Sequence, residues 1–245
     1  MIPNVEAFIV CWNEEQMIRH TLNHYSTFCS KITLLDNYST DDTIAIAQQR
    51  FPAVEVVKFD TNNEHRDDVL LSVKNNCWKN SSADYVIVCD TDEFLYAEDM
   101  IGKLEKLCQY QVALPLVMGF NMGAAEFPGN FEIPIYQQVK TGVRERQFDK
   151  QIIFNPKVVE EINYEMGCHE CRPVLNKEKI MDMAVEFKLL HYKFLGRDYL
   201  SKKHEAYANR LSLFNLRTAI GSHYLDKSHI DKCFSQLDKH IYKVI

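Results

Sequence analysis

The sequence predicts an α/β protein with a mostly parallel central sheet flanked by helices. In the first half of the chain, apolar segments of strand length alternate with segments of helical periodicity. The strand segments are apolar on both faces, which is typical of parallel strands buried between two layers of helices. The second half is less regular and ends in helical segments. We therefore expect one compact domain over residues 1–245.

The first half contains four predicted strands and four predicted helices. Ser, Thr, Asp and Asn side chains often accept hydrogen bonds from the free N–H groups at a helix start. Asn13 is therefore expected to cap the first helix, and the Ser/Thr/Asp cluster from residue 39 the second. The predicted strands are Val5–Trp12, Lys31–Asp36, Val54–Phe59 and Tyr85–Asp90, and the predicted helices are Asn13–Phe28, Ser39–Phe51, Arg66–Lys79 and Glu98–Cys108.

The second half contributes further strands, a long loop and two helices. The loop is predicted from its glycines and prolines, which favour turns over regular structure. We expect strands within Val112–Phe120, Lys150–Val159 and Val185–Phe194, a loop over Asn121–Pro134, and helices over Arg197–Arg217 and Ser228–Val244.

The charge balance disfavours a nucleic-acid partner. The chain has 28 basic and 34 acidic residues, a net charge of −6, and no Lys/Arg run that would neutralise a phosphate backbone. No apolar stretch reaches the length of about 20 residues that a membrane helix needs. The first residues lack the basic start and small-residue cleavage site of a secretory signal. We expect no transmembrane segment and a cytoplasmic location.

The eight cysteines are more typical of buried thiols than of a metal site. Cys168 and Cys171 form the single C-x-x-C motif, but a structural zinc site usually has four protein ligands. His229 and Cys233 are a possible second pair, although their spacing places them on one helix face. Zinc is therefore not the favoured interpretation. The cysteines within or beside apolar segments are Cys11, Cys29, Cys77, Cys89 and Cys108.

Acidic residues follow the fourth strand, at the edge where parallel sheets bind ligands. Asp90 and Asp92 are two residues apart, so in an extended chain both carboxylates point the same way. A divalent cation with oxygen ligands would relieve their repulsion, and it could also hold a diphosphate. The alternative is a capped turn whose acids are solvated.

Three segments place these acids in a wider pattern. They are FIVCWNEE (Phe8–Glu15), ITLLDNYSTDDT (Ile32–Thr43) and YVIVCDTDEF (Tyr85–Phe94). In this order they resemble the nucleotide-sugar-binding half of GT-A-fold glycosyltransferases, especially family 2 and its relatives with a D-x-D-E-F motif. The resemblance is specific over about residues 5–120. It implies a GT-A, Rossmann-like fold, with residues 1–120 binding the donor and residues 121–245 the acceptor.

The resemblance also implies an activity and a set of roles. The activity is transfer of a sugar, with inversion, from a UDP- or GDP-linked donor to a hydroxyl of a glycan or other acceptor, with Mn²⁺ or Mg²⁺ as cofactor. Asp90 and Asp92 would bind the cation, Asp90 also facing the ribose, with Glu93 behind them and Phe94 packed under the turn. His191 would complete the metal shell. The remaining donor contacts would be Cys11, Asn13, Glu14 and Asp36 at the base and ribose, and Arg66 and Lys74 at the diphosphate.

One part of the family pattern is missing. Many family 2 enzymes carry a Glu-Asp pair near the start of a later helix, where one acid is the general base, and no such pair follows Gln151. His169 and Glu170 occupy about that place and are the candidates for the base or for acceptor contacts. Glu126 lies in the Gly/Pro loop that would face the acceptor. The alternatives are half-buried structural imidazoles for His169 and His191, and simple exposure for Glu126.

Two other classes of protein remain possible from the sequence. A nucleotidyltransferase would also use a parallel sheet, a nucleotide and a metal, but a glycine-rich phosphate loop would be expected after the first strand. The segment CWNEEQM has no glycine there. A non-catalytic nucleotide-sugar-binding module would share the fold, and the intact Asp90 and Asp92 argue against it.

Overall fold

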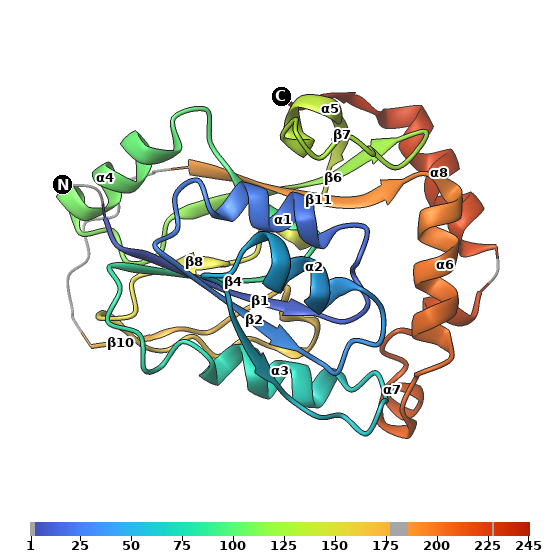
Figure 1. The fold of residues 1–245 in the computed structure, drawn as a ribbon, viewed down its shortest axis with the longest axis horizontal. Coiled ribbons are helices and arrows are strands. Elements are labelled where there is room, and N and C mark those ends of the chain that lie inside the picture. Colours follow the sequence, from blue (N-terminus) through green and yellow to red (C-terminus); the bar gives the residue numbers. More distant parts are fainter. Residues whose placement is uncertain (1–2, 177–185, 227) are drawn as a thin grey trace.

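The chain folds around two five-stranded sheets (Figure 1). The structure is a computed structural model that describes residues 3–176, 186–226 and 228–245. In the first sheet the strand order is β3-β2-β1-β4-β8, and the first four strands are parallel. β8 pairs antiparallel with β4 at the edge. The strands are β1 (Val5–Cys11), β2 (Lys31–Asp36), β3 (Glu55–Lys58), β4 (Tyr85–Asp90) and β8 (Ile153–Phe154).

Helices cover both faces of this sheet, as the apolar pattern predicts. Val5, Ala7 and Ile9 of β1 pack in one cluster with residues of α1, α2 and α4. The alternate residues Phe8 and Val10 pack on the opposite face with residues of α3. The alternation follows from the two-residue period of a strand. The helices are α1 (Ile18–Tyr25), α2 (Thr43–Arg50), α3 (Asp67–Asn76) and α4 (Met100–Tyr110).

The second sheet is mixed, and its strand β5 begins directly after the D-x-D turn. Its order is β12-β7-β6-β11-β5, in which β6 and β11 are parallel and the other pairs antiparallel. The chain leaves the first sheet after Asp90, and β5 pairs with β11, which places His191 opposite Glu93. The strands are β5 (Glu93–Tyr96), β6 (Leu116–Ala124), β7 (Thr141–Arg144), β11 (Glu186–Leu195) and β12 (Tyr242–Lys243).

Several predicted boundaries in the first 160 residues are wrong for local reasons. Asn13 has a positive φ of 51° and does not cap α1, because its side-chain oxygen instead accepts from the Thr40 N–H at 2.7 Å. Residues 121–124 of the predicted loop extend β6, and a short helix α5 (Ile135–Gln138) follows the rest. The predicted strand over residues 150–159 is mostly irregular. Within it, β8 is the regular element and β9 (Val159–Glu161) begins at its end, while η1 (Arg146–Phe148), η2 (Met166–Cys168) and β10 (Val174–Leu175) lie on either side of it.

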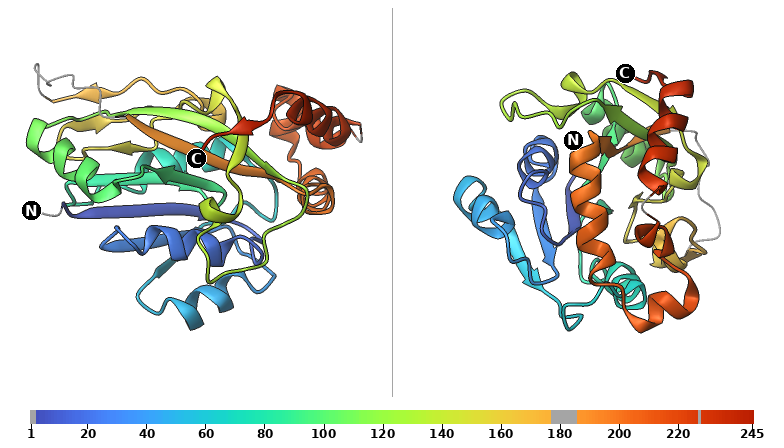
Figure 2. Two further views of the ribbon diagram at one scale, coloured as in Figure 1. Left: turned by 90° about the horizontal axis from the view of Figure 1, so that it is seen from above. Right: turned by 90° about the vertical axis from the view of Figure 1, so that its right-hand side faces the viewer.

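The C-terminal helices cross the edge at which the strands of the first sheet end. Figure 2 shows α6 (Arg197–Ala208) standing in front of that edge, with α8 (His229–His240) beside the second sheet. The predicted helix Arg197–Arg217 is broken, because Ser212 caps a separate α7 (Leu213–Thr218). A short η3 (Ser222–Leu225) leads towards α8, which ends before β12. Val185, the predicted first residue of the strand now seen as β11, lies outside the described residues.

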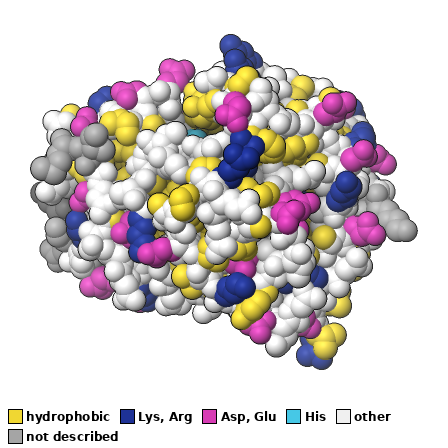
Figure 3. Space-filling model, viewed as in Figure 1, with side chains coloured by type: hydrophobic (Ala, Val, Ile, Leu, Met, Phe, Trp, Pro, Cys, Tyr) yellow, Lys and Arg dark blue, Asp and Glu magenta, His cyan; other side chains and the backbone are white. Residues whose placement is uncertain are grey.

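Charged side chains of both signs lie on the surface. Figure 3 shows acidic and basic side chains interspersed on one face, without a continuous basic area there. Within the part of the chain that the structure describes, no helix is long and apolar enough to cross a membrane.

Candidate active site

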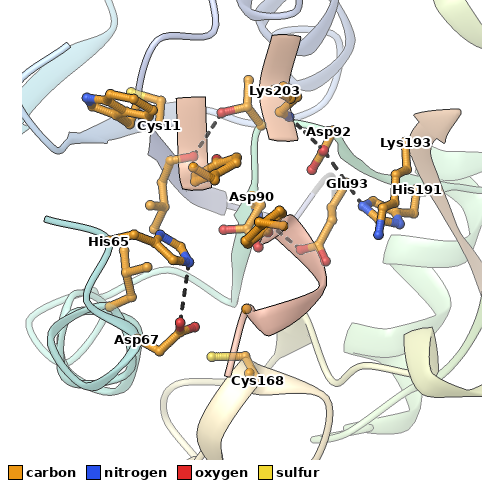
Figure 4. Close-up of a pocket in the computed structure, with 18 of the residues that line it drawn as sticks. Cys11, His65, Asp67, Asp90, Asp92, Glu93, Cys168, His191, Lys193 and Lys203 are labelled. Carbon is orange, nitrogen blue, oxygen red and sulfur yellow. Dashed lines mark hydrogen bonds and ion pairs between the residues drawn. The ribbon is translucent and has the colours of Figure 1, made fainter. Parts of the chain in front are cut away.

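A cavity of about 300 Å³ lies at the carboxyl ends of β1 and β4 (Figure 4). Its walls come from these strand ends, from α3, from the segment around η1 and η2, from β11, and from α6 and η3. This is the edge at which parallel α/β sheets bind ligands. Eight of the residues expected from the sequence line it: Cys11, Glu14, Lys74, Asp90, Asp92, Glu93, His169 and His191.

Thr91 anchors the turn that carries the two aspartates. Its hydroxyl donates to the Val10 carbonyl at 2.8 Å, and its own carbonyl accepts from the Thr21 hydroxyl at 2.6 Å. Thr91 is 1% exposed and its hydroxyl is bonded inward, although it borders the cavity between Asp90 and Asp92. The strand-to-turn geometry therefore directs the two acids outward and the threonine into the core.

Each acid of the D-x-D-E segment pairs with a lysine from a different part of the chain. Asp90 meets Lys74 of α3 at 2.7 Å, and Glu93 meets Lys150 at 2.6 Å. These ammonium groups, together with that of Lys203, offset the repulsion that the sequence pattern raises. Glu93 also accepts from the Asp90 N–H at 3.0 Å, which ties the end of β4 to the start of β5.

Lys203 of α6 bridges two acids. Its ammonium lies 3.0 Å from Asp92 Oδ2 and 2.9 Å from Glu14 Oε1. Burial opposes ionisation of Asp92, but Lys203 and His191 outweigh it and hold the pKa of Asp92 well below its ordinary value. Burial likewise opposes the charge on Glu93, which Lys150 and Lys74 overcome, and the pKa of Glu93 falls to about 2. For Glu14 burial dominates, and its pKa rises to about 7 although Lys203 is adjacent.

His191 presents one ring nitrogen to Asp92. Its Nδ1 lies 2.8 Å from the side-chain oxygen of Asn121, which only accepts, so Nδ1 carries the proton. The other ring nitrogen, Nε2, lies 3.7 Å from Asp92 Oδ2. The ring stacks on Phe148 with centroids 4.0 Å apart. Packing therefore fixes the orientation of this imidazole.

His169 has the same tautomer in a different setting. Its Nδ1 lies 2.8 Å from the Gln147 carbonyl and so donates to it, which leaves Nε2 free to accept a proton. Desolvation and the nearby Lys150 ammonium lower the pKa of His169 below 6.5. Gly167 and Cys168, at φ of 80° and 56°, form the turn that precedes it. The ring is therefore held as a neutral base at the cavity wall.

Five other candidates lie away from the cavity lining. Asp36 is fully buried beneath it and accepts from the Ser39 N–H at 2.9 Å, while Asn13 bridges to Thr40. The Arg66 guanidinium pairs with Asp68 at 2.6 Å and with Glu64 at 3.7 Å. Glu170 is exposed next to His169. Glu126 lines a second cavity of about 710 Å³, bordered by α6 and α8.

Cavity residues from the C-terminal helices were not predicted from the sequence. Lys203, Tyr207 and Arg210 come from α6 and the turn after it, in a segment whose pattern indicates only a surface helix. The Arg210 guanidinium lies 3.6 Å from the centre of the Trp12 ring and donates to Asn37 Oδ1 at 2.8 Å. No local spacing marks these residues, because it is the fold that brings α6 onto the strand ends.

The C-x-x-C cysteines are not part of a zinc site in the described residues. All eight cysteines are free. Cys168 is buried at the cavity wall, and Cys233 lies 3.3 Å from His229 within α8. Across residues 3–176, 186–226 and 228–245, no three His, Cys, Asp or Glu side chains gather closely enough to hold a metal by themselves.

The parallel sheet, the D-x-D turn at its carboxyl edge and the second mixed sheet define an α/β domain of the glycosyltransferase class. The family model described as glycosyl transferase family 2 matches residues 7–162. Since this is more than half of the chain, the chain belongs to that family. The family and the GT-A fold predicted from the sequence are both confirmed.

Among curated proteins, the SPbeta prophage-derived glycosyltransferase SunS of Bacillus subtilis (strain 168) is 29% identical over 107 residues. This match covers 44% of this chain and 24% of that protein, so the chain spans about a quarter of its curated relative. The crystal structure of S. aureus TarS has a TM-score of 0.50 at 13% identity, over 83% of this chain and 38% of that one. At this identity the likeness concerns the fold alone.

Proposed function

We propose that this chain transfers a sugar from a nucleoside-diphosphate sugar to an acceptor hydroxyl with the help of a divalent cation. One observation carries the proposal: in a family 2 chain, Glu14, Asp90 and Asp92 meet Lys74 and Lys203 at the strand ends around one cavity. Ammonium groups bind phosphate oxygens, and carboxylates bind the cations that accompany diphosphates. The donor would be UDP- or GDP-linked, and the acceptor a glycan or another hydroxyl compound.

The donor would lie along the ends of β1 and β4. Cys11 and Glu14 line the cavity at the end of β1 and would face the base and ribose, with Asn13 and Asp36 shaping the loops behind them. Lys74 is the basic residue we assign to the diphosphate, because its ammonium is already in the cavity beside Asp90. Arg66 is engaged by Asp68 and Glu64, so we assign it no donor contact.

The residues present fit Mn²⁺ or Mg²⁺ bound mainly through the donor. His191 Nε2 and Asp92 Oδ2 are 3.7 Å apart, and two ligands of one ion with bonds of about 2.1 Å commonly lie about 3–4 Å apart. Magnesium typically takes one or two carboxylates plus substrate phosphates and water, so a preformed cluster of three protein ligands is not needed. When bound, the cation would offset the negative charge that develops on the leaving diphosphate. Asp90 would support it through water.

His169 is the side chain we assign as general base. Its Nε2 has no proton in the tautomer fixed by Gln147, and the ring lines the cavity. The acceptor oxygen would bond to the anomeric carbon as the bond to the diphosphate breaks, its proton would pass to His169 Nε2, and the electron pair would leave with the nucleoside diphosphate. A single displacement of this kind inverts the anomeric carbon. Glu170 and Glu126 would then serve acceptor contacts rather than proton transfer.

A screen of nucleotide sugars tests the proposal. The protein would be incubated with UDP- and GDP-linked sugars and Mn²⁺, and release of the nucleoside diphosphate would be measured with and without EDTA. We expect one donor to be hydrolysed slowly in a metal-dependent reaction. If neither nucleotide series is hydrolysed or bound, the proposed donor class is wrong. Release that is unaffected by EDTA would remove the cation from the mechanism.

A further inference from the structure

Lys74, Lys150 and Lys203 pair with the acids of the D-x-D-E segment. Lys203 is the one of the three whose ammonium forms ion pairs with two carboxylates of the cavity. It comes from α6, beyond the residues 7–162 that the family model matches. Figure 4 shows it reaching from the helix towards Asp92. Its side chain is 17% exposed and that of Asp92 is 14% exposed. The pair therefore faces the cavity, whereas the Lys150–Glu93 pair, which also borders the cavity, is more deeply buried at 5% and 2% exposed.

Two cations would compete for the same oxygen. Asp92 Oδ2 lies 3.0 Å from Lys203 Nζ and 3.7 Å from His191 Nε2. A divalent ion held by Asp92 and His191 would repel the ammonium across a few ångström of partly buried space. Lys203 would then have Glu14, at 2.9 Å, as its remaining carboxylate partner.

A bound diphosphate would supply the partner that Lys203 loses. We propose that Lys203 binds the donor diphosphate and exchanges partners: it pairs with Asp92 in the free protein, and with a phosphate oxygen once a cation occupies Asp92. This inference rests on the proposed function. Glu14 keeps the ammonium close to the cavity in both states, so the exchange needs a side-chain movement and no displacement of α6.

The exchange predicts that Lys203 has opposite effects on the affinity for the cation and on the affinity for the nucleotide. Without nucleotide, Lys203 opposes cation binding because it occupies Asp92. With nucleotide, it adds a charge-assisted hydrogen bond to phosphate. Lys203 thereby couples the two binding events, and such coupling is reciprocal. If Lys203 only supported the fold, its removal would lower the affinity for the cation and for the nucleotide together.

Binding measurements on Lys203→Gln test this assignment. Titration of the nucleotide-free protein with Mn²⁺ should give a dissociation constant about tenfold lower than in wild type, the change that about 1.4 kcal/mol produces. Titration with UDP and with GDP at saturating Mn²⁺ should give affinities about tenfold weaker for whichever one the wild type binds. Lys203→Arg should retain nucleotide binding. Lys202→Gln, at an exposed position one residue earlier, is the matched control and should match wild type in both titrations.

The outcomes separate the two proposals. If wild type binds neither UDP nor GDP with Mn²⁺, the proposed function is wrong and the role of Lys203 falls with it. A second outcome is that the wild type binds one of them, and Lys203→Gln has unchanged affinities or a lower affinity for both Mn²⁺ and the nucleotide. In that case only the partner exchange is overturned. Should Lys203→Gln fail to fold because Asp92 and Glu14 are left unpaired, the Glu14→Gln/Lys203→Gln protein is compared with Glu14→Gln alone. The same opposite shifts are then expected.

Discussion

At the scale of single residues, the charge of Asp92 matters more than its shape. Asp92→Asn keeps the size of the side chain and removes the charge that both Lys203 and a divalent cation would contact. We expect transfer to fall by at least about 100-fold, since ligand-sphere changes typically cost 10–100-fold even when they are indirect. Activity at several Mn²⁺ concentrations, with circular dichroism to verify the fold, is the measurement. Near wild-type turnover at saturating metal would exclude Asp92 as a ligand.

The same substitution has a second consequence for stability. Repulsion between Asp90 and Asp92 suggests, from the sequence alone, that Asp92→Asn would stabilise the free protein. The structure reverses this expectation, because Asp92 is already paired with Lys203 and its pKa is held low by that pair. We therefore expect no gain in the free energy of unfolding.

Substitution of the two cavity histidines should affect the metal requirement differently. His191 offers Nε2 to Asp92, so His191→Ala should raise the Mn²⁺ concentration for half-maximal activity by about 10–100-fold. His169 is held by Gln147 and offers a free Nε2, so His169→Ala should lower turnover by about 10²–10⁴-fold at an unchanged metal requirement. Metal titrations of both variants distinguish these effects. A shifted metal requirement in His169→Ala alone would exchange the two roles.

At the scale of elements, the sequence predicts strands better than helix ends. Strands β1, β2 and β4 were predicted within a residue, because a strand buried on both faces leaves a continuous apolar run. The start of α1 was not, because Asn13 forms a contact with the loop after β2 that lies 27 residues away. The break between α6 and α7 falls just before the Ser212 cap, where the chain also meets a distant loop because the Arg210 carbonyl accepts from the His65 N–H at 2.6 Å. Neither contact has a local signal.

The residues of the candidate site also differ in whether the sequence predicts them. Glu14, Asp90 and Asp92 belong to short motifs at strand ends, and the rule that ligands bind at that edge was sufficient to find them. Lys203, the partner of Asp92, and Lys150, the partner of Glu93, lie 111 and 57 residues from those acids. Lysines are common on protein surfaces, so spacing could not identify these two. The packing of α6 across the sheet edge explains the role of Lys203, and the segment after η1 brings Lys150 to Glu93.

Helix α1 gives the protein a specific sensitivity to acid. His24 is buried among the rings of Tyr25, Phe28 and Phe94, and its Nε2 donates to the Leu95 carbonyl at 2.8 Å. Burial lowers the pKa of His24 from 6.5 to about 4. In that interval the unfolded chain binds a proton that the folded protein does not, so stability is lost as the pH falls from 6.5 towards 4.

The contribution of His24 can be measured by comparing pH values. Between pH 7 and pH 5 it should cost the wild type about 2 kcal/mol of unfolding free energy. His24→Gln keeps a donor for Leu95 without a titrating ring, so its loss over the same interval should be smaller by about that amount. Urea unfolding at both pH values is the measurement, with the exposed His240→Gln as control. Equal pH dependence in all three proteins would refute the assignment.

At the scale of the whole molecule, the site is a meeting point of distant segments. The ends of β1 and β4 and the turns after them supply the acids, the second sheet supplies His191 through β11, and α6 and the turn after it supply Lys203 and Arg210. A ligand that contacts all of these binds the folded chain and not the unfolded one. Binding should therefore stabilise the entire fold, and not only the loops of the cavity.

Thermal unfolding with Mn²⁺ and a nucleoside diphosphate tests that consequence. At about 100 times the dissociation constant a ligand adds about 2.7 kcal/mol, which for a chain of this size raises the melting temperature by about 5–10 °C. The increase should require both components, because Lys203 and the cation each neutralise part of the diphosphate charge. Mn²⁺ alone should give a small shift, since Lys203 already occupies Asp92. An undiminished shift with nucleoside diphosphate in excess EDTA would show that the lysines bind it without a metal.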